Sequence, residues 1–265
     1  MKLDVRNVSF AYDDKSVLSN VSFSAQDGEM IALLGPNGVG KSTLFKCILG
    51  FLKPQKGSVE IDGRAVQSLS DRERALCTAY IPQSFNPVFN HTVLDTVVMG
   101  SANSLSLFET PGRDEREKAS LLIDQMGIGE IKDRGTRKIS GGERQLMLLA
   151  RSLMQDAKIL IMDEPTASLD FANSHRVMRK VRELADNGYT VIFSTHSPSL
   201  AALYSTSIIA LKNGTVLKKG SVGDIMTGEM LSSLYSFPIV TASVRIGDEE
   251  HFVCVPEKGS GNGQA

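Results

Sequence analysis

Residues 35–43 decide how this chain folds, and they read Gly35-Pro36-Asn37-Gly38-Val39-Gly40-Lys41-Ser42-Thr43. Their spacing matches G-x-x-x-x-G-K-[ST], the pattern of a loop whose backbone N–H groups surround a phosphate. An apolar run at 30–34 precedes the loop and is typical of a buried parallel strand. Apolar residues then recur at helical spacing until Gly50, where we expect the helix to end. Strand, glycine-rich loop and helix are the context that the motif requires, so the sequence predicts an α/β nucleotide-binding core.

Two side chains of this loop carry the expected chemistry. Lys41 should bridge the β- and γ-phosphates of a bound nucleotide, and the Ser42 hydroxyl should ligate Mg²⁺. The glycines let the backbone wrap a phosphate, and the helix that follows points its N-terminus at it. An ordinary glycine-rich turn before a capped helix is the alternative, which we disfavour because spacing and flanking elements both match the motif.

Composition restricts the class of protein. The 265 residues are 42% hydrophobic and 22% charged, which fits a globular chain with one large domain or a domain with a sizeable insert. The formal net charge of −1 argues against a sequence-independent nucleic-acid binder, which is usually basic. The three cysteines lie far apart without metal-ligand spacing, which fits a reducing, cytosolic compartment. The N-terminus lacks the apolar core of a signal peptide, and no run reaches the roughly 20 apolar residues that a bilayer requires. We therefore expect any membrane span to come from another chain.

Two acidic residues follow a second buried strand. The apolar run 159–162 ends in Asp163-Glu164, a pattern that suits Mg²⁺ handling beside a phosphate loop. We expect Asp163 to hold the metal through water, and Glu164 to orient and deprotonate the attacking water. The alternative is that both acids are merely solvated loop residues, and the phosphate loop upstream makes this alternative the weaker one.

Gln83 and His196 lie where two further predicted strands end. Gln83 lies at the end of a strand that we expect to stop at Pro82, and His196 follows a strand at 189–194. The carboxyl ends of parallel strands meet in one crevice, where side chains contact ligands. We therefore expect Gln83 to sense a ligand and His196 to contact the γ-phosphate, with a purely structural role as the alternative for each.

Residues 84–155 lack strand patterns, and we interpret them as a helical insert. Helical spacing covers 93–99 and 116–126, with Thr92 and Asp114 as the expected N-caps. These segments predict a block of helices inside the α/β domain.

The last helix of the insert begins at Ser140-Gly141-Gly142-Glu143. Ser140 and Glu143 form a capping box, S-x-x-E, which explains why a helix starts here. The box does not explain the paired glycines, each of which costs roughly 1 kcal/mol of helix stability relative to alanine. A close approach of the backbone to a phosphate would explain them, yet the chain already has such a site at Lys41.

The N-terminal segment alternates as strands at 3–10 and 21–24. Tyr12 lies at the end of the first strand. Its side chain is either a half-exposed turn aromatic or a platform that stacks on an adenine ring, and the sequence leaves both roles open.

The C-terminal extension, 237–265, has a weaker pattern. Two strands are expected there, at 239–246 and 251–255. A tail rich in glycine follows, and we expect it to be disordered.

Together these motifs resemble the ATP-binding subunit of an ABC transporter over roughly residues 2–236. The matching segments, in chain order, are Walker A (Gly35–Thr43), the Q-loop (Gln83), the signature (Ser140-Gly141-Gly142), Walker B (Ile159–Glu164), the D-loop (Ser168-Leu169-Asp170) and the switch histidine (His196). Tyr12 falls where the family has its adenine-stacking aromatic. The resemblance implies an α/β P-loop NTPase core with an antiparallel β subdomain and an inserted α-helical subdomain, with residues 1–236 as the ATPase domain.

The resemblance also implies ATP and Mg²⁺ as ligands. It places Lys41, Gln83, Glu164 and His196 in the catalytic set, Ser42, Gln83 and Asp163 at the metal, and the remaining motif residues, Asp170 included, at the nucleotide. In the family, two subunits pack head to tail, and each signature helix caps the nucleotide held by the other subunit. The second glycine pair would then serve a second ATPase subunit, such as an identical copy. The signature departs from the commonest L-S-G-G-Q at Ile139 and Glu143, and the glutamate keeps the capping acceptor.

A narrower resemblance, at 93–100, 142–146 and 169–173, is to the subunits that power uptake of ferric siderophores, haem and cobalamin. Importers of molybdate or tungstate share much of this pattern, and Ser174 stands where the group often has glutamine. This resemblance implies transmembrane permease subunits as partners, an indirect substrate-binding protein, no nucleic acid, and a peripheral place on the cytoplasmic face of the cell membrane. The alternatives are another importer motor, an exporter motor, a soluble ABC ATPase of translation or DNA maintenance, and a P-loop kinase or GTPase.

Overall fold

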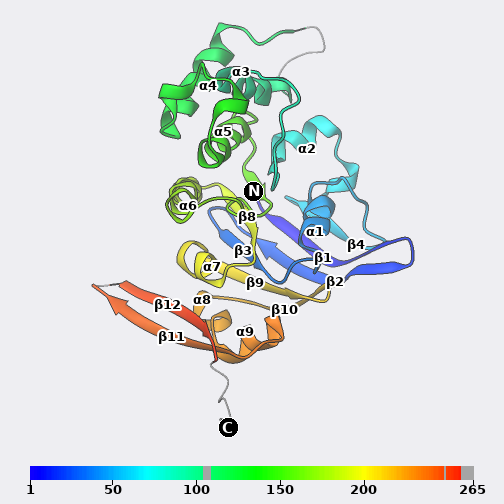
Figure 1. The fold of residues 1–265 in the computed structure, drawn as a ribbon. Coiled ribbons are helices and arrows are strands. Elements are labelled where there is room, and N and C mark those ends of the chain that lie inside the picture. The colour runs from blue at the N-terminus through cyan, green and yellow to red at the C-terminus, as the bar shows by residue number, and fades with distance from the viewer. Residues whose placement is uncertain (104–108, 248, 258–265) are drawn as a thin grey trace.

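The computed structural model describes residues 1–103, 109–247 and 249–257 (Figure 1). Its centre is a six-stranded sheet in the order β10-β9-β3-β8-β7-β6. The strands are Met30–Leu34 (β3), Thr78–Ile81 (β6), Ile159–Met162 (β7), Thr190–Thr195 (β8), Ser207–Lys212 (β9) and Thr215–Gly220 (β10). The pairs β3–β8, β3–β9, β6–β7 and β7–β8 are parallel, and β9–β10 is antiparallel. The carboxyl ends of β3, β6, β7 and β8 therefore meet at one edge, as the motifs predict.

A second, antiparallel sheet covers one face of the first. Its order is β2-β1-β4-β5, and its strands are Leu3–Tyr12 (β1), Lys15–Ala25 (β2), Lys56–Ile61 (β4) and Arg64–Ala65 (β5). The first two strands are longer than the predicted 3–10 and 21–24, because their pairing continues to Tyr12 and Lys15.

Two apolar layers fix the position of the central sheet. Successive residues of a strand point to opposite faces. Ile31 and Leu33 pack in a cluster shared with β1, β2 and helix α1 (Lys41–Ile48), whereas Met30 and Leu34 pack in a cluster shared with the helices of the insert and with those that follow β7. Burying one such side chain stabilises the fold by about 1.5–3 kcal/mol. Because β3 is buried on both faces, the loop that follows it is held firmly.

Helices cover the other face of the sheet and form the insert at the top of Figure 1. They are α3 (Val93–Val98), α4 (Arg113–Gln125), α5 (Gly141–Leu153), α6 (Phe171–Asp186) and α7 (Pro198–Tyr204). This arrangement confirms the predicted fold class. No helix among the described residues is both long and apolar enough to cross a bilayer.

The helix starts test the predicted caps. The Thr92 hydroxyl accepts the Asp95 N–H at 3.0 Å, which confirms Thr92 as an N-cap. The prediction of Asp114 was wrong, because α4 begins at Arg113, two residues earlier than a cap at Asp114 implies, and Gly112 is its N-cap. The Gly112 N–H donates to the Glu115 carboxylate at 2.8 Å, so the helix start is satisfied without Asp114.

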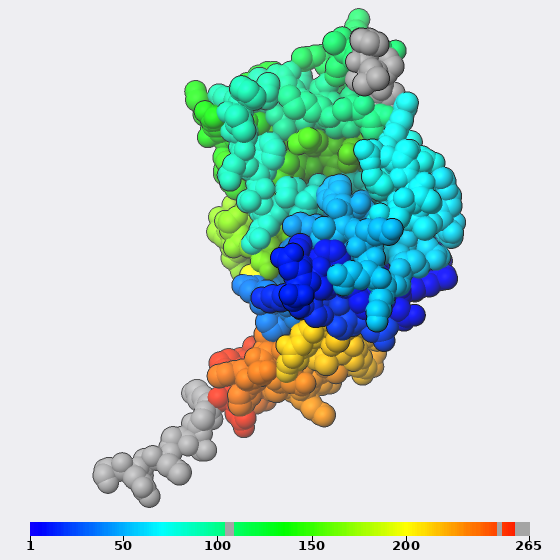
Figure 2. Space-filling view, turned by 90° about the vertical axis from the view of Figure 1, so that its right-hand side faces the viewer, coloured from blue at the N-terminus to red at the C-terminus, as the bar shows by residue number. Residues whose placement is uncertain are grey.

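The C-terminal elements lie at the end of the molecule away from the helical insert (Figure 2). They are α8 (Val222–Ile225), α9 (Gly228–Tyr235) and a hairpin of β11 (Ile239–Ile246) and β12 (Glu249–Pro256). Both expected strands are present, and the second begins two residues earlier than predicted. The tail predicted to be disordered lies outside the described residues from 258 on. The division of the chain into 1–236 and 237–265 stays a proposal.

Candidate functional site

The predicted phosphate loop lies between β3 and α1 and borders a cleft of about 370 Å³. Gly40 has a φ of 108°, and a Cβ there would meet the Leu18 side chain at 2.9 Å, so this position requires glycine. Lys41 is only 5% exposed, and its Nζ donates to the carbonyls of Gly35 (2.7 Å) and Pro36 (3.1 Å). The cleft is lined by Tyr12, Val17, Asn37, Gly38, Gly40, Lys41, Ser42, Thr43, Gln83 and Glu164. The fold therefore gathers predicted site residues from separate segments of the chain.

Asp163 and Glu164 lie directly after β7 and share one hydroxyl. Asp163 is buried, and its Oδ1 accepts the hydroxyl of Ser194 at 2.7 Å. The backbone N–H of Glu164 donates to the same Ser194 oxygen at 2.8 Å. Glu164 has a φ of 44°, a left-handed conformation that is rare for a side chain of this kind and that clusters at functional sites. Ser194 is therefore a positioning residue for both acids, and the sequence analysis missed it.

Tyr80 of β6 stands beside the same carboxylate. Burial, and then the negative charge of Asp163, raise the pKa of Tyr80 to about 12. Tyr80 was not predicted either, although strand β6 ends next to Gln83. The signal for both residues was a hydroxyl on a strand that leads into a predicted site.

The Glu164 carboxylate is the point where four predicted residues meet. Its Oε1 lies 3.3 Å from the Lys41 Nζ, and its Oε2 lies 3.3 Å from the His196 Nδ1. The Gln83 Nε2 reaches the same Oε2 at 3.5 Å, the long limit of a hydrogen bond. These groups come from α1, the end of β6, the end of β7 and the end of β8. The arrangement therefore holds the Glu164 carboxylate, which can accept a proton, directly beside the phosphate loop.

Tyr12 lies at the rim of the cleft. Its side chain is 43% exposed, and the Phe10 ring stands edge-on to it with the ring centroids 4.9 Å apart. An exposed aromatic ring that a second ring supports is suited to stacking on a flat ligand.

The signature residues do not line this cleft. Ser140 caps α5, and the capping box is present, because the Ser140 N–H donates to the Glu143 carboxylate at 2.7 Å. That hydrogen bond lowers the pKa of Glu143. Gly141 is exposed, whereas Gly142 is buried and a Cβ on it would meet the Asn173 side chain at 2.6 Å. The packing of α5 on α6 within the same chain therefore explains why position 142 is a glycine. The sequence did not reveal this contact.

Asp170 belongs with the signature rather than with the phosphate loop. It is the N-cap of α6, and it accepts the Asn173 backbone N–H at 2.8 Å and the Asn173 side-chain N–H at 2.8 Å. The backbone hydrogen bond, followed by the side-chain one, lowers the pKa of Asp170. The predicted site is thus divided into one group around Glu164 and a second group at the starts of α5 and α6.

The donor set fits Mg²⁺. Across the described part of the chain, no three His, Cys, Asp or Glu side chains gather into a group that could hold a metal by themselves. Mg²⁺ usually keeps several waters and takes one or two carboxylates together with phosphate oxygens. The Ser42 hydroxyl at the cleft and the buried Asp163 carboxylate supply donors of this kind, so they suit a metal that arrives with a nucleotide.

A family comparison explains this arrangement. The model of the family described as "ABC transporter" matches residues 18–167, which include the phosphate loop, the signature helix and the acid pair. The chain belongs to the ABC transporter family. Its members' ATP-binding domains bind nucleotide and hydrolyse ATP for transport, and this chain is such an ATPase.

Relatives of known name cover nearly the whole chain. A protein of Helicobacter pylori named an iron chelatin transport ATP-binding protein is 37% identical over 241 residues, which are 90% of this chain and 94% of that protein. The hemin import ATP-binding protein HmuV of Thermobifida fusca is 35% identical over 244 residues, 91% of this chain and 84% of that one. Among solved structures, an inward-facing ABC transporter described as metal-chelate type superimposes with a TM-score of 0.86 at 29% identity, covering 96% of both chains. This chain is therefore similar to ABC ATPases of iron-chelate and hemin transport.

Proposed function

We propose that this chain powers an importer for a metal chelate, such as a ferric siderophore, haem or cobalamin, from the cytoplasmic face of the membrane. The observation that carries the proposal is the meeting of Lys41, Gln83 and His196 at the Glu164 carboxylate. The similarity to iron chelatin and hemin transport proteins supports the class of cargo. The ATPase would act with permease subunits, and indirectly with a substrate-binding protein.

The contacts suggest how the residues hydrolyse ATP. Lys41 leaves the Gly35 and Pro36 carbonyls and the Glu164 carboxylate when the β- and γ-phosphates enter the loop. This releases Glu164 to take a proton from the attacking water as the water oxygen bonds to the γ-phosphorus and the bond to the leaving ADP oxygen breaks. His196 holds the other carboxylate oxygen, from where it would contact the γ-phosphate. Ser42, Gln83 and Asp163 would hold Mg²⁺, which neutralises charge on the phosphate oxygens when bound.

The second group of site residues belongs to a second copy. Ser140 and Gly141 are exposed at the start of α5, and neither lines the chain's own cleft. The N-terminus of a helix with free N–H groups attracts a phosphate. We assign Ser140, Gly141, Gly142 and Asp170 to the nucleotide held by the other subunit of a symmetric dimer.

A groove between the core and the insert is suited to the permease. It measures about 550 Å³ and is lined by side chains of both parts, among them Phe51, Pro82 and Arg151. Phe51 is 66% exposed. The Arg151 guanidinium, half-buried on α5, makes no hydrogen bond or ion pair within the described residues, and burial lowers its pKa. Pro82 adjoins Gln83, so a segment seated in the groove would lie one residue from a contact of Glu164.

Arg151 provides a test of this coupling. In the complex purified with its permease, the cargo chelate should raise the ATPase rate, whereas molybdate should not. Arg151→Glu should reduce this stimulation at least tenfold with an unchanged basal rate. The reversed charge would be buried against a permease segment that is complementary to the arginine. Arg151→Lys, which keeps the charge, is the control. Stimulation that survives Arg151→Glu would contradict this docking role, and stimulation by molybdate alone would overturn the proposed cargo.

Tyr12 provides a test of the adenine platform. Tyr12→Ala should weaken ATP affinity by about 0.5–1.5 kcal/mol through lost stacking, with little change in the rate at saturating ATP. Tyr12→Phe keeps the ring and should bind normally. A Michaelis constant for ATP that Tyr12→Ala leaves unchanged would reduce Tyr12 to a turn residue.

A further inference from the structure

Tyr235, the last residue of α9, contacts the backbone of a site residue from outside the cleft. Its hydroxyl donates to the His196 carbonyl at 3.0 Å, across 39 positions of the chain. Tyr235 does not line the cleft beside the phosphate loop. The ring of His196 points the other way, with its Nδ1 3.3 Å from the Glu164 carboxylate. His196 is therefore held at its ring by Glu164 and at its backbone by Tyr235.

The peptide that joins His196 to Ser197 is held by two hydroxyl groups. Strand β8 ends at Thr195, so His196 is the first residue beyond the support of the sheet. The N–H of this peptide, on Ser197, donates to the Thr195 Oγ1 at 3.0 Å. Its carbonyl, on His196, accepts the Tyr235 hydroxyl from the other side. The orientation of the peptide, and with it the direction of the His196 ring, depends on both contacts.

Tyr235 itself is well anchored. Its ring packs against the main apolar core. The Lys212 ammonium, at the end of β9, donates to the Ser236 hydroxyl at 3.0 Å and to the Ser233 carbonyl, which holds the end of α9 on the central sheet. Burial, and then the neighbouring Cys254, raise the pKa of Tyr235, so the phenol keeps its proton and remains a donor. Tyr235 can therefore act as a fixed support for a mobile peptide.

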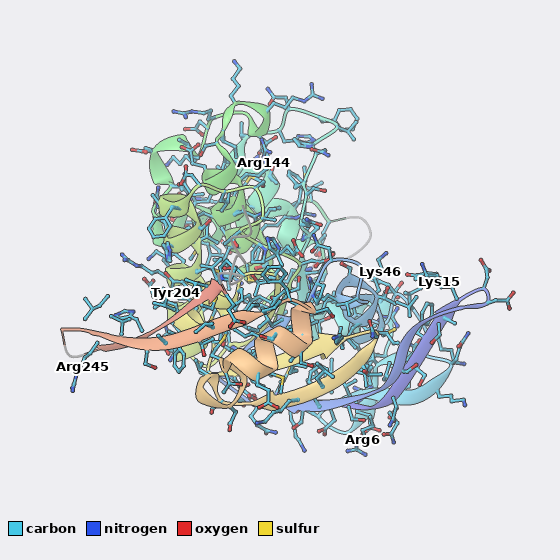
Figure 3. All side chains as sticks on the ribbon, turned by 60° about the horizontal axis from the view of Figure 1, so that its bottom comes forward. Arg6, Lys15, Lys46, Arg144, Tyr204 and Arg245 are labelled. Atoms are coloured by element: carbon cyan, nitrogen blue, oxygen red, sulfur yellow. The ribbon has the colours of Figure 1, made fainter. Side chains whose placement is uncertain are left out.

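The β11–β12 hairpin stands beside this contact. A hollow of about 280 Å³ is lined by His196 and Tyr235 together with Cys254 and Val255 of β12. Figure 3 shows the hairpin projecting from the body with Arg245 near its tip. The C-terminal elements thus reach the nucleotide site through Tyr235.

We propose that Tyr235 is a positioning residue for ATP hydrolysis, and that its hydroxyl keeps the His196 ring directed at Glu164 and the γ-phosphate. This inference rests on the role that the proposed function gives His196. Without the hydroxyl, the His196 carbonyl loses its donor and the peptide can turn, so the ring is correctly placed for a smaller fraction of the time. The phosphate loop and Tyr12 would be unaffected, so the loss should appear in the rate of hydrolysis rather than in ATP affinity.

Tyr235→Phe in the full chain tests this, because it removes only the hydroxyl and keeps the packed ring. We expect kcat to fall about three- to tenfold, the size of one lost neutral hydrogen bond, with KM for ATP changed less than about twofold. Tyr204→Phe is the matched control. The Tyr204 hydroxyl, labelled with its residue in Figure 3, lies 2.8 Å from the His175 Nδ1 and outside the site, so its removal should leave kcat unchanged. A normal kcat in Tyr235→Phe, or equal losses in the two variants, would overturn the proposal.

The histidine rings provide a readout that does not depend on turnover. The chain has four histidines, so NMR of the labelled rings can resolve their signals, and the one from His196 is assigned by its absence in His196→Ala. Tyr235→Phe should shift or broaden the His196 signal, whereas Tyr204→Phe should shift that of His175. A His196 signal that Tyr235→Phe leaves in place would contradict the positioning role even if kcat fell.

His196→Ala separates this inference from the proposed function. It should lower kcat more than Tyr235→Phe does, because it removes the ring itself rather than the support of the ring. If His196→Ala hydrolyses ATP normally, the role proposed for His196 fails and this inference fails with it. If His196→Ala is impaired while Tyr235→Phe hydrolyses normally, the inference alone fails.

Discussion

Replacing Glu164 by glutamine should lower the rate of ATP hydrolysis by about 10²–10⁴ and leave ATP binding intact. The amide keeps the shape and the contacts within reach of Lys41 and His196, but it cannot accept a proton from water. With binding preserved and chemistry blocked, the closed dimer should accumulate in ATP.

Size-exclusion chromatography with and without ATP, together with phosphate release, would measure both effects. Glu183→Gln, an exposed residue that pairs with Lys180 on α6, is a matched control and should behave as the wild type. A Glu164→Gln chain that turns over normally, or that stays monomeric in ATP, would contradict the assigned role.

A bulky residue at Gly141 should abolish hydrolysis and leave nucleotide binding to the chain's own phosphate loop unchanged. Gly141 is the better probe of the signature because it is exposed, whereas a side chain at Gly142 would strike Asn173 of the same chain. We expect Gly141→Trp to lower turnover about 100-fold or more and to prevent ATP-driven dimerisation, because the indole would keep the partner's nucleotide away from the preorganised N–H groups at the start of α5, and loss of one such interaction costs about that much. ATP affinity of the monomer should stay near normal, because its phosphate loop is intact. Gly141→Ala, whose methyl would meet the Leu169 side chain at 3.0 Å and the Ser168 carbonyl at 3.9 Å, is the control.

Mixing two inactive variants sharpens this prediction. A heterodimer of Lys41→Ala and Gly141→Trp subunits has one composite site with both defects and another with neither. Activity should return in the mixture, which could not happen if the two residues served the same chain's site. Loss of ATP binding by the isolated Gly141→Trp monomer would contradict the arrangement between subunits.

The sequence predicted the central part of the site because each element there has a local pattern. Lys41 follows a glycine-rich loop, while Gln83, Glu164 and His196 each follow a buried strand. Parallel strands bring their carboxyl ends together, so three local patterns sufficed to place the contacts of Glu164 in one crevice. The expected fold class followed from the same alternation of buried strands and helices.

What the sequence did not predict depends on neighbours in space. The role of Ser194 follows from the β7–β8 pairing that sets it beside Asp163, and its own strand marks it only as a hydroxyl close to a predicted site. The reason for Gly142 is a packing contact with Asn173, 31 positions later in the chain. Asp114 is not the cap of α4, because the helix starts before it and the Gly112 N–H donates to the Glu115 carboxylate. Helix α2 (Asp71–Cys77) was missed although Ser70 and Glu73 form a readable capping box.

The hydroxyl of Ser194 has a consequence for how this site can change. It binds the Asp163 carboxylate on one side and the Glu164 backbone on the other, at 2.7 Å and 2.8 Å. Adjacent residues with different tasks are thereby joined through an atom that belongs to neither of them. A substitution at Ser194 would therefore disturb both the carboxylate that we propose for the metal and the peptide that carries the proposed proton acceptor.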